Sequence, residues 1–346
     1  MKKDLNVLIT GGAGFIGSHV VEYFAETYPE YQILVMDSIT YAADEEFFKN
    51  LESRYINVVT IRQDIRDAKS CLWAIKDFKI DAIIHLAAES HVDNSIESPN
   101  IFVETNVIGT LNLLNAAKEV WKKPTVDNIF YHISTDEVYG HLGLDDPAFT
   151  EETPYDPRSP YSASKASSDH MVRAFGATHG LPIVISNCSN NYGERQHREK
   201  LLPKTIINLL TGKKIPVYGK GENIRDWLYV KDHVKAIDTI FHLYAEDNKI
   251  GATYNIGGDS EVRNIDIVKK LIHIHMEETE EFPFVSPSGA EKLYEKHIEY
   301  VTDRKGHDFR YAINHDKLTH ETGWKPSVEL REGLKITYNY YKNLLK

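Results

Sequence analysis

The sequence predicts an α/β protein built on a doubly wound parallel sheet, and three observations lead to this fold class. Short apolar runs alternate with stretches of helical periodicity over roughly the first 190 residues. The run at 82–88 is almost wholly apolar, which is typical of a strand covered by helices on both faces of a parallel sheet. A glycine-rich turn at 11–17 stands between the first strand and the first helix. Repeated strand–helix units with right-handed crossovers build such a sheet.

Size and composition allow one large α/β unit and a smaller lobe, because 346 residues can bury a sizeable core. The formal net charge is -11, no polybasic block occurs and the apolar runs are strand-sized, so neither a nucleic-acid surface nor a membrane span is expected. Only Cys71 and Cys188 are present, and the N-terminus has no signal-like apolar segment, which favours a reducing cytoplasm. The 16 histidines are scattered without CxxC or HExxH, so no metal site is expected.

The first strand–helix unit is predicted to bind a dinucleotide. Residues 7–10 form a β-branched strand, and the turn at 11–17 opens an amphipathic helix that runs to about Tyr28. Glycines let the backbone approach a pyrophosphate, whose charge is attracted by free N–H groups and the positive end of the helix dipole. The next strand, 33–36, ends in Asp37, whose carboxylate can accept hydrogen bonds from the adenosine ribose and would repel a 2'-phosphate. We therefore expect NAD rather than NADP.

The next units continue the sheet. Residues 44–55 are expected to form a polar helix or loop, 58–61 a third strand, 82–88 a strand buried on both faces, and 183–186 a further strand. Beyond Asn187 the pattern changes to helices and isolated short strands. Three turn-rich segments interrupt this part: 190–193, 218–221 and 286–289. We expect a smaller C-terminal α/β lobe there, with two segments returning to the main sheet: 232–243 and 254–257.

Residues 99–118 show helical periodicity with two apolar stripes. The stripes contain, first, Phe102, Asn106 and Leu113 and, second, Val103, Val107, Leu111 and Leu114. One stripe can face the sheet, and the other needs a partner. The helix expected after residue 160 carries further apolar side chains: Met171, Val172 and Phe175. Helices paired between two copies would cover these positions, so we expect a homodimer.

A candidate acid/base site follows the central strand, 129–133. This apolar run leads directly into Ser134, Thr135, Asp136 and Glu137, so the strand delivers hydroxyls and two carboxylates to one place. Further on, Tyr161 and Lys165 are four residues apart at the start of a helical pattern, which places the phenol and the ammonium on one helix face.

These features resemble a known family. The glycine turn at 11–17 and the pair Tyr161 and Lys165 resemble the extended short-chain dehydrogenase/reductases, NAD-dependent Rossmann-type enzymes that act on nucleotide sugars. Five motifs in order narrow the resemblance to the nucleotide-sugar 4,6-dehydratases: 87–93, 134–140, 161–166, 189–193 and 225–230. The resemblance covers nearly the whole chain. In the loop at 193–200, Glu194 and Arg198 stand where the family pattern usually has prolines.

The resemblance implies a role for each catalytic residue. Tyr161 would be the base for the sugar alcohol and Lys165 would hold the nicotinamide ribose, while Thr135 supplies a positioning hydroxyl, Asp136 an acid and Glu137 a base. The implied NAD contacts lie at the glycine turn and the strand ends: Gly11, Gly14, Phe15, Ile16, Gly17, Asp37, Ser38, Asp64, Ile65, Leu86, Ala87, Ala88, Ser90, Thr105, Tyr161, Lys165, Cys188 and Asn190. The implied substrate contacts are Ser90, His91, Thr135, Asn190, Lys200, Leu201, Tyr218, Arg225, Asn264, Arg304 and His307.

The same resemblance implies a division of the chain and a substrate. Residues 1–190 would form the NAD-binding domain, with returning segments near 228–258 and 309–325. The nucleotide-sugar lobe would comprise 191–227, 259–308 and 326–346. The implied substrate is dTDP-glucose, with UDP- and CDP-glucose left open.

The expected chemistry requires an acid, a base and a redox cofactor. Oxidation at C4 of a hexose makes the C5 proton acidic and puts the C6 hydroxyl β to a carbonyl, so a base at C5 and an acid at O6 eliminate water. Return of the hydride to C6 gives a 4-keto-6-deoxy sugar. The alcohol base has to be a phenolate although free tyrosine has a pKa of about 10. Lys165 and the nicotinamide of NAD are expected to lower the pKa of Tyr161.

Three other functions share part of this pattern. A C4 epimerase uses the same fold, NAD and Tyr/Lys pair but has no use for an acid at O6, so Asp136 disfavours it. A nucleotide-sugar decarboxylase can use a glutamate at the place of Glu137 but typically has serine at that of Asp136. A redox sensor that only binds the dinucleotide need not keep Tyr161, Lys165 and the carboxylate pair together.

Overall fold

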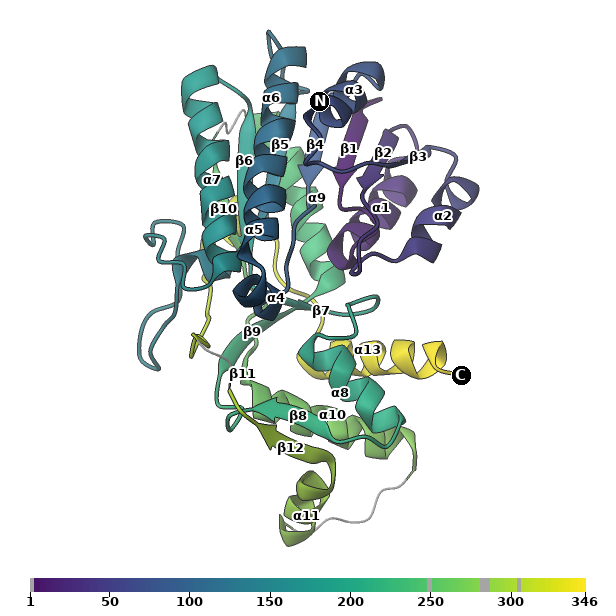
Figure 1. The fold of residues 1–346 in the computed structure, drawn as a ribbon, viewed down its shortest axis with the longest axis vertical. Coiled ribbons are helices and arrows are strands. Elements are labelled where there is room, and N and C mark those ends of the chain that lie inside the picture. Colours follow the sequence, from purple (N-terminus) through teal and green to yellow (C-terminus); the bar gives the residue numbers. More distant parts are fainter. Residues whose placement is uncertain (1–2, 248–250, 281–286, 304–305) are drawn as a thin grey trace.

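The computed structural model describes residues 3–247, 251–280, 287–303 and 306–346. Its largest element is a seven-stranded parallel sheet with the order β10-β6-β5-β4-β1-β2-β3 (Figure 1). The strands are β1 (Asn6–Thr10), β2 (Gln32–Asp37), β3 (Val58–Arg62), β4 (Ala82–His85), β5 (Ile129–Thr135), β6 (Ile183–Cys188) and β10 (Thr253–Ile256). The predicted Rossmann-type α/β fold is confirmed. Strand order reverses between β1 and β4, the place where such sheets bind ligands at the carboxyl ends of their strands.

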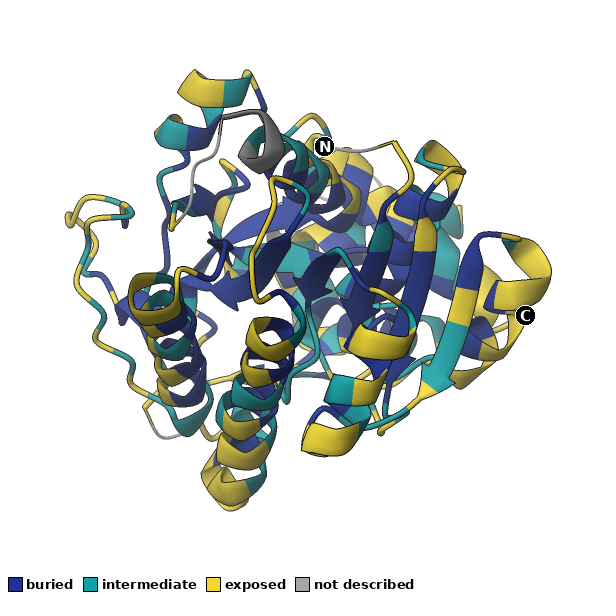
Figure 2. Cartoon of the chain, turned by 90° about the horizontal axis from the view of Figure 1, so that it is seen from above, coloured by how far each residue is buried: buried dark blue, intermediate teal, exposed yellow. Residues whose placement is uncertain are grey.

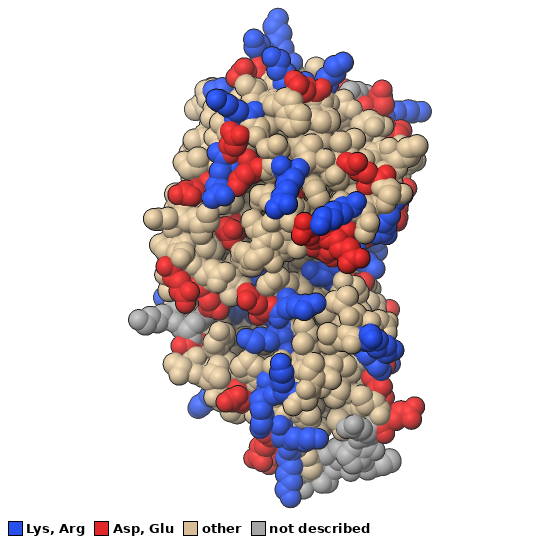
Figure 3. All heavy atoms as spheres, turned by 45° about the vertical axis from the view of Figure 1, so that its right-hand side comes forward, with Lys and Arg blue, Asp and Glu red and all other residues tan. Residues whose placement is uncertain are grey.

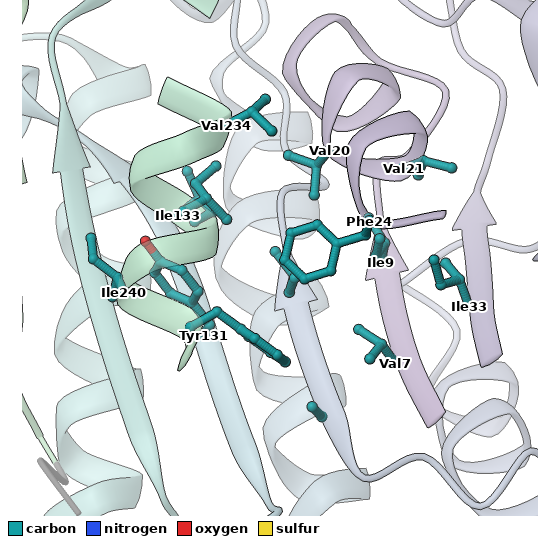
Figure 4. Packing of buried hydrophobic residues seen from close by; sticks show 14 of the residues in the cluster. Val7, Ile9, Val20, Val21, Phe24, Ile33, Tyr131, Ile133, Val234 and Ile240 are labelled. Carbon is teal, nitrogen blue, oxygen red and sulfur yellow. The ribbon is translucent and has the colours of Figure 1, made fainter. Parts of the chain in front are cut away.

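Helices cover both faces of this sheet, which explains the apolar strand sequences. One face packs on α1 (Phe15–Thr27), α2 (Glu45–Arg54) and α9 (Val230–Asp247), and the other on α3 (Ala68–Asp77), α6 (Thr110–Val120) and α7 (Pro160–His179). Every residue of β4, β5 and β6 is buried, and the dark-blue strands of Figure 2 lie beneath helices whose outer sides are exposed. Figure 4 shows side chains of α1 and α9 packing on those of β1 and β5, with Phe24 near the centre.

The second part of the chain forms the lower half of Figure 1. It contains a three-stranded sheet, β11-β9-β7, and the strand pair β12-β8. These strands are β7 (Asn190–Tyr192), β8 (Ile215–Tyr218), β9 (Ile224–Tyr229), β11 (Glu261–Arg263) and β12 (Ile298–Val301). The helices are α8 (Leu201–Leu210), α10 (Asn264–Glu278), α11 (Pro287–His297) and α13 (Leu330–Leu344), while α12 (Asp316–Thr322) lies beside β10. A separate apolar cluster joins α8, α10 and α13 to β8 and β9.

The segment expected as one helix at 99–118 is broken into several elements, so that prediction was wrong in detail. After α4 (Val92–Glu97) come α5 (Pro99–Phe102), a π-helix, η1 (Val103–Gly109), and then α6. Buried Asn106 explains the irregularity, because its amide binds the backbone N–H and C=O of Glu89 (2.8 and 3.0 Å) and the Ser164 hydroxyl (2.8 Å). π-Helical turns are frequent at functional sites. Here the turn fixes the loop after β4 against α7.

The two apolar stripes of this segment meet different surroundings. In the first stripe Phe102 and Leu113 are buried, whereas in the second stripe Val103 is half exposed and Leu114 is buried; Ile108, which belongs to neither stripe, is also half exposed. On α7, Val172 and Phe175 belong to the core beneath the helix, so they do not form the outer surface that the sequence pattern suggested. None of the described helices is both long enough and apolar enough to cross a membrane.

Candidate active site

The carboxyl ends of β1, β2, β4, β5 and β6 open into one cavity of about 400 Å³. All eighteen residues predicted to contact NAD line it, and so do all five predicted catalytic residues. The cavity also includes residues outside the predicted catalytic, NAD-binding and substrate-binding sets: Met36, Thr40, Ala42, Ala43, Gln63, Arg66, Glu89, Ile101, Ile133, Ser134, Ser189, Asn191, Gln196 and His197. Many of these lie in loops, where no local pattern marks a ligand contact.

The glycine turn is packed so closely that side chains at Gly11 and Gly17 would clash with neighbouring backbone. A Cβ on Gly17 would lie 2.1 Å from the carbonyl oxygen of Gly11, and one on Gly11, whose φ is +71°, would lie 2.7 Å from the backbone of Ala87. Gly14 caps α1 without a side-chain hydrogen bond, and the first residues of the helix, Phe15, Ile16 and Gly17, line the cavity. This arrangement fits the pyrophosphate of a dinucleotide, which helix N-termini bind through N–H groups and the helix dipole.

Asp37 at the end of β2 is fixed by the backbone. Its Oδ2 accepts a hydrogen bond from Ala13 N (3.0 Å) and its Oδ1 from Ile39 N (2.8 Å). Burial raises the pKa of this carboxyl above its ordinary value, and the two N–H donors counteract the rise. The carboxylate therefore faces the cavity in a single orientation, next to the turn that would hold the pyrophosphate.

The carboxylate pair begins a short 3-10 helix, η2 (Asp136–Tyr139), directly after β5. The Thr135 hydroxyl accepts a hydrogen bond from Glu137 N (3.3 Å) and donates one to Asp136 Oδ1 (3.3 Å). Asp136 is 1% exposed, and within the described residues its Oδ2 has no hydrogen-bond partner. Burial, and then the neighbouring Glu137 and Asp226, raise the pKa of Asp136 well above its ordinary value. The surroundings of Asp136 therefore favour its protonated form over the carboxylate.

Tyr161 and Lys165 lie in the first two turns of α7. A capping box between Ser159 and Ser162, with Pro160 at the first position, starts the helix. The buried side chain of Lys165 donates a hydrogen bond from Nζ to Ile133 O at 2.8 Å, so its ammonium lies against the end of β5.

The expected lowering of the pKa of Tyr161 is not produced by the surrounding residues. Burial raises the pKa of Tyr161 well above its ordinary value, Glu137 raises it further, and hydrogen bonding with Thr135 works in the opposite direction. Burial of the phenol and the charge of Glu137 therefore outweigh the hydrogen bond with Thr135.

The predicted substrate residues separate into two groups. Ser90, Thr135, Asn190 and Lys200 line the cavity, and Lys200 donates a hydrogen bond to Ser90 O at 3.0 Å. The others lie outside its lining: His91, Leu201, Tyr218, Arg225, Asn264 and His307. Arg304 lies outside the described residues. Several of these side chains engage neighbours instead, since Tyr218 contacts Asp93 at 3.4 Å and His307 contacts Asp303 at 2.7 Å.

Arg225 is buried at the boundary between the sheet and the second part of the chain. Its guanidinium donates hydrogen bonds to the carbonyls of Ile224 (2.7 Å) and Asp308 (3.0 Å) and lies 4.2 Å from the centre of the Tyr311 ring. Its positive charge lowers the pKa of Asp136 against the larger effects of burial and Glu137. Arg225 therefore influences Asp136 electrostatically although it lies outside the residues that line the cavity.

The loop at 193–198 attaches the second part of the chain to α1. Arg195, with a left-handed φ of +62°, pairs with Glu22 and donates to His19 Nδ1 at 2.9 Å. Glu194, one of the two departures from the family pattern, accepts a hydrogen bond from Tyr229 (2.9 Å) and pairs with Lys231 (3.0 Å). The loop also contributes Gln196 and His197 to the cavity. Figure 3 shows Lys and Arg side chains gathered along the waist between the two halves.

Comparisons with known proteins agree with this geometry. A family model described as GDP-mannose 4,6 dehydratase matches residues 8–337. A dTDP-glucose 4,6-dehydratase of Haemophilus influenzae is 44% identical over 345 residues, covering 97% of this chain and 98% of the relative.

Solved structures show the same similarity. The dTDP-glucose 4,6-dehydratase of Streptomyces venezuelae with NAD bound is 38% identical, with a TM-score of 0.84 and coverage of 98% and 97%. A UDP-glucose 4-epimerase of Thermotoga maritima is 28% identical, with a TM-score of 0.83 and coverage of 99% and 100%. Because dehydratase and epimerase match the fold equally well, the residues of the site must separate the two activities.

Proposed function

The chain belongs to the family described by the GDP-mannose 4,6 dehydratase model, and from this premise we propose that it converts dTDP-glucose to dTDP-4-keto-6-deoxyglucose. It is an NAD-dependent nucleotide-sugar 4,6-dehydratase. The observation that carries the proposal is the pair of buried Asp136 and partly buried Glu137 at the end of β5, in the same cavity as Tyr161 and Lys165.

NAD fits the residues present. Glycines 11, 14 and 17 line the cavity at the start of α1, where backbone N–H groups would bind the pyrophosphate, and the fixed carboxylate of Asp37 lines it where it would accept hydrogen bonds from the adenosine ribose. When bound, NAD supplies the acceptor for the C4 hydride and later the donor of that hydride to C6.

The first half of the reaction, oxidation at C4, depends on two side chains of α7. Tyr161 removes the proton of the C4 hydroxyl while the C4 hydride leaves the sugar, which gives the 4-keto sugar. Lys165 places its positive charge in the same buried region, where it favours the developing phenolate.

The second half of the reaction, elimination of water, depends on the carboxylate pair. Glu137 takes the C5 proton, which the new C4 carbonyl has made acidic, and Asp136 gives its proton to the departing C6 hydroxyl, so water leaves. Two adjacent carboxyl groups do this only if one is protonated and the other is not. Burial of Asp136 beside Glu137 works toward this difference because it raises the pKa of Asp136 and so favours its protonated form.

The alternatives fit the site less well. A C4 epimerase has no use for a buried acid facing C6, and a decarboxylase of this family typically carries serine at the position of Asp136. A dinucleotide sensor would need neither the carboxylate pair nor Tyr161 and Lys165. In this chain all four side chains line one cavity with the glycine turn.

Substrate labelled with deuterium at C4 tests the proposal. The dehydratase moves the label to C6 of the same sugar and introduces solvent hydrogen at C5. A mixture of labelled and unlabelled dTDP-glucose serves as the control, because one enclosed cofactor produces no crossover of label between molecules. Deuterium that stays at C4, or that is lost to water, would contradict the proposal. UDP- and CDP-glucose assayed in parallel decide the nucleotide preference.

We also propose a homodimer in the cytoplasm, with an NAD-binding domain of residues 1–190 and a nucleotide-sugar lobe of 191–227, 259–308 and 326–346. Segments near 228–258 and 309–325 return to the first domain. The half-exposed Val103 and Ile108 beside α7 support a helix-pairing interface. Both cysteines are buried free thiols, which suits a reducing compartment.

A further inference from the structure

A buried carboxylate lies behind the catalytic face of α7. Asp169 follows Tyr161 and Lys165 at intervals of four residues, so the three side chains share one face of the helix. Asp169 has no exposed surface. Neither the sequence motifs nor the mechanism above gives this residue a role, although isolated buried charges are costly in proteins.

The carboxylate is built into a hydrogen-bonded cluster. Its Oδ2 accepts hydrogen bonds from the hydroxyls of Ser134 and Tyr155, each at 2.8 Å, and its Oδ1 lies 3.1 Å from His132 Nε2. Ser134 and His132 belong to β5, the strand that ends in the catalytic Thr135. Asp169 therefore connects α7 to the strand that carries the acid and the base.

Titratable side chains from four elements surround Lys165, and their charge states can be compared. The titratable groups around it are Tyr161 and Asp169 on α7, His132 on β5, His85 on β4 and Cys188 on β6. Burial lowers the pKa of His132 to about 4 and that of His85 well below its ordinary value, and burial raises the pKa of Cys188 to about 12. These three groups are therefore neutral near pH 7.

Among these titratable groups around Lys165, within the part of the chain that the structure describes, Asp169 is the one that is negatively charged near neutral pH. Burial by itself would raise the pKa of Asp169, but hydrogen bonding to His132 and the charge of Lys165 lower it overall. In return, burial lowers the pKa of Lys165 and Asp169 opposes that effect. The charge of each group therefore shifts the pKa of the other toward its ionised form, in a region where both side chains are buried.

We propose that Asp169 is a positioning residue for oxidation at C4, which keeps Lys165 protonated and holds the end of β5 in register with α7. This inference rests on the proposed dehydratase function. It follows that Lys165 can stabilise the phenolate of Tyr161 only while the carboxylate of Asp169 is charged. Steps at C5 and C6 depend on Asp169 only through the placement of β5.

The test compares Asp169→Asn with Asp169→Glu in the purified holoenzyme. Rapid mixing with dTDP-glucose and following NADH absorbance in a single turnover measures oxidation at C4 across the pH range. Without the carboxylate Lys165 loses its proton at lower pH, so the alkaline limb of the Asp169→Asn profile should move down by about one pH unit, the lower end of the effect of an opposite charge nearby. Asp169→Glu keeps the charge, so its alkaline limb should stay in place even if the rate falls.

Two further variants separate positioning from stability. Asp232→Asn removes another buried carboxylate, which binds Ser327 and Val328 on a different element, and should leave the pH profile unchanged. Tyr155→Phe removes one hydroxyl donor from Asp169 and raises its pKa, so the acid limb should move to higher pH while the alkaline limb stays. This variant provides the answer if Asp169→Asn does not fold.

Unshifted profiles in both Asp169→Asn and Tyr155→Phe would overturn the inference, and so would an Asp169→Glu profile that moves as far as that of Asp169→Asn. A wild-type enzyme that forms no NADH with the substrate would overturn the proposed function instead, so the two failures are distinguishable.

Discussion

Replacement of Asp136 by asparagine separates the two halves of the reaction. Asparagine keeps the size of the side chain and can keep the hydrogen bond with the Thr135 hydroxyl, but it has no proton to give to O6. Because Tyr161 and Lys165 are untouched, oxidation at C4 should proceed at nearly the wild-type rate. Elimination should slow by about 10² to 10⁴, the usual contribution of a general acid, which corresponds to about 3 to 5 kcal/mol of activation free energy.

Stopped-flow absorbance of NADH and the yield of 4-keto product measure the two steps. In the variant NADH should accumulate with dTDP-glucose and decay slowly. The wild-type elimination rate should fall as the pH rises through the raised pKa of Asp136, since the acid is then lost, whereas the variant should lack this alkaline limb. Asp232→Asn, at a buried carboxylate outside the cavity, is the matched control and should show neither change.

Thermal unfolding checks that the variant is intact. The folded state binds the proton of Asp136 more tightly than the unfolded chain does, so this residue destabilises the fold as the pH rises from the ordinary pKa toward the raised one. Asparagine removes that term, and at pH 7 to 8 the variant should melt at the wild-type temperature or above. A lower melting temperature, or equal loss of NADH formation and elimination, would show that Asp136 acts in the structure rather than as the acid.

Two further predictions concern the cofactor and the assembly. Gly17→Ala places a Cβ 2.1 Å from the carbonyl oxygen of Gly11, so the purified variant should retain less than about a tenth of the wild-type NAD, as measured by cofactor extraction. Gly212→Ala, at a positive φ with open space around it, is the control and should retain all of the NAD. Full retention in both variants would refute the role of the turn. Ile108→Glu puts a charge on the half-exposed surface of the π-helix and should change the mass measured by light scattering from that of a dimer to that of a monomer. Ile56→Glu, on the loop before β3, is the control and should leave the mass unchanged. A wild-type protein that is monomeric at micromolar concentration would disprove the dimer.

The sequence was most informative where structure follows from local rules. The turn at 11–17, the acid at Asp37 and the residues after β5 were predictable because a parallel sheet brings every carboxyl end to one edge, and the spacing of Tyr161 and Lys165 depends only on helix geometry. NAD and the dehydratase family were also identified correctly from these motifs.

Tertiary contacts account for what the sequence did not predict. The π-helix at 103–109 exists because Asn106 binds the backbone of Glu89 and the Ser164 hydroxyl, and those partners lie 17 and 58 residues away. The burial of Val172 and Phe175 depends on how α7 is rotated against the sheet. The raised pKa of Tyr161 reflects burial, which a helical pattern alone does not reveal.

The contact between Arg195 and α1 bears on how long a cofactor molecule stays with one protein molecule. Arg195 pairs with Glu22 and binds His19, two residues on the helix whose first residues line the cavity, while the adjoining Gln196 and His197 line that cavity. Burial, followed by the charge of Arg195, lowers the pKa of His19 to about 4, so the ring stays neutral and does not repel the guanidinium in the physiological range. Moving the loop at 193–198 away from α1, and with it Gln196 and His197 of the cavity lining, therefore requires breaking a partly buried ion pair and its hydrogen bond, which favours slow exchange of NAD with the medium. An enzyme that regenerates its oxidant within every cycle tolerates such slow exchange without loss of throughput, whereas a dehydrogenase that must swap NADH for NAD each turnover would be limited by it.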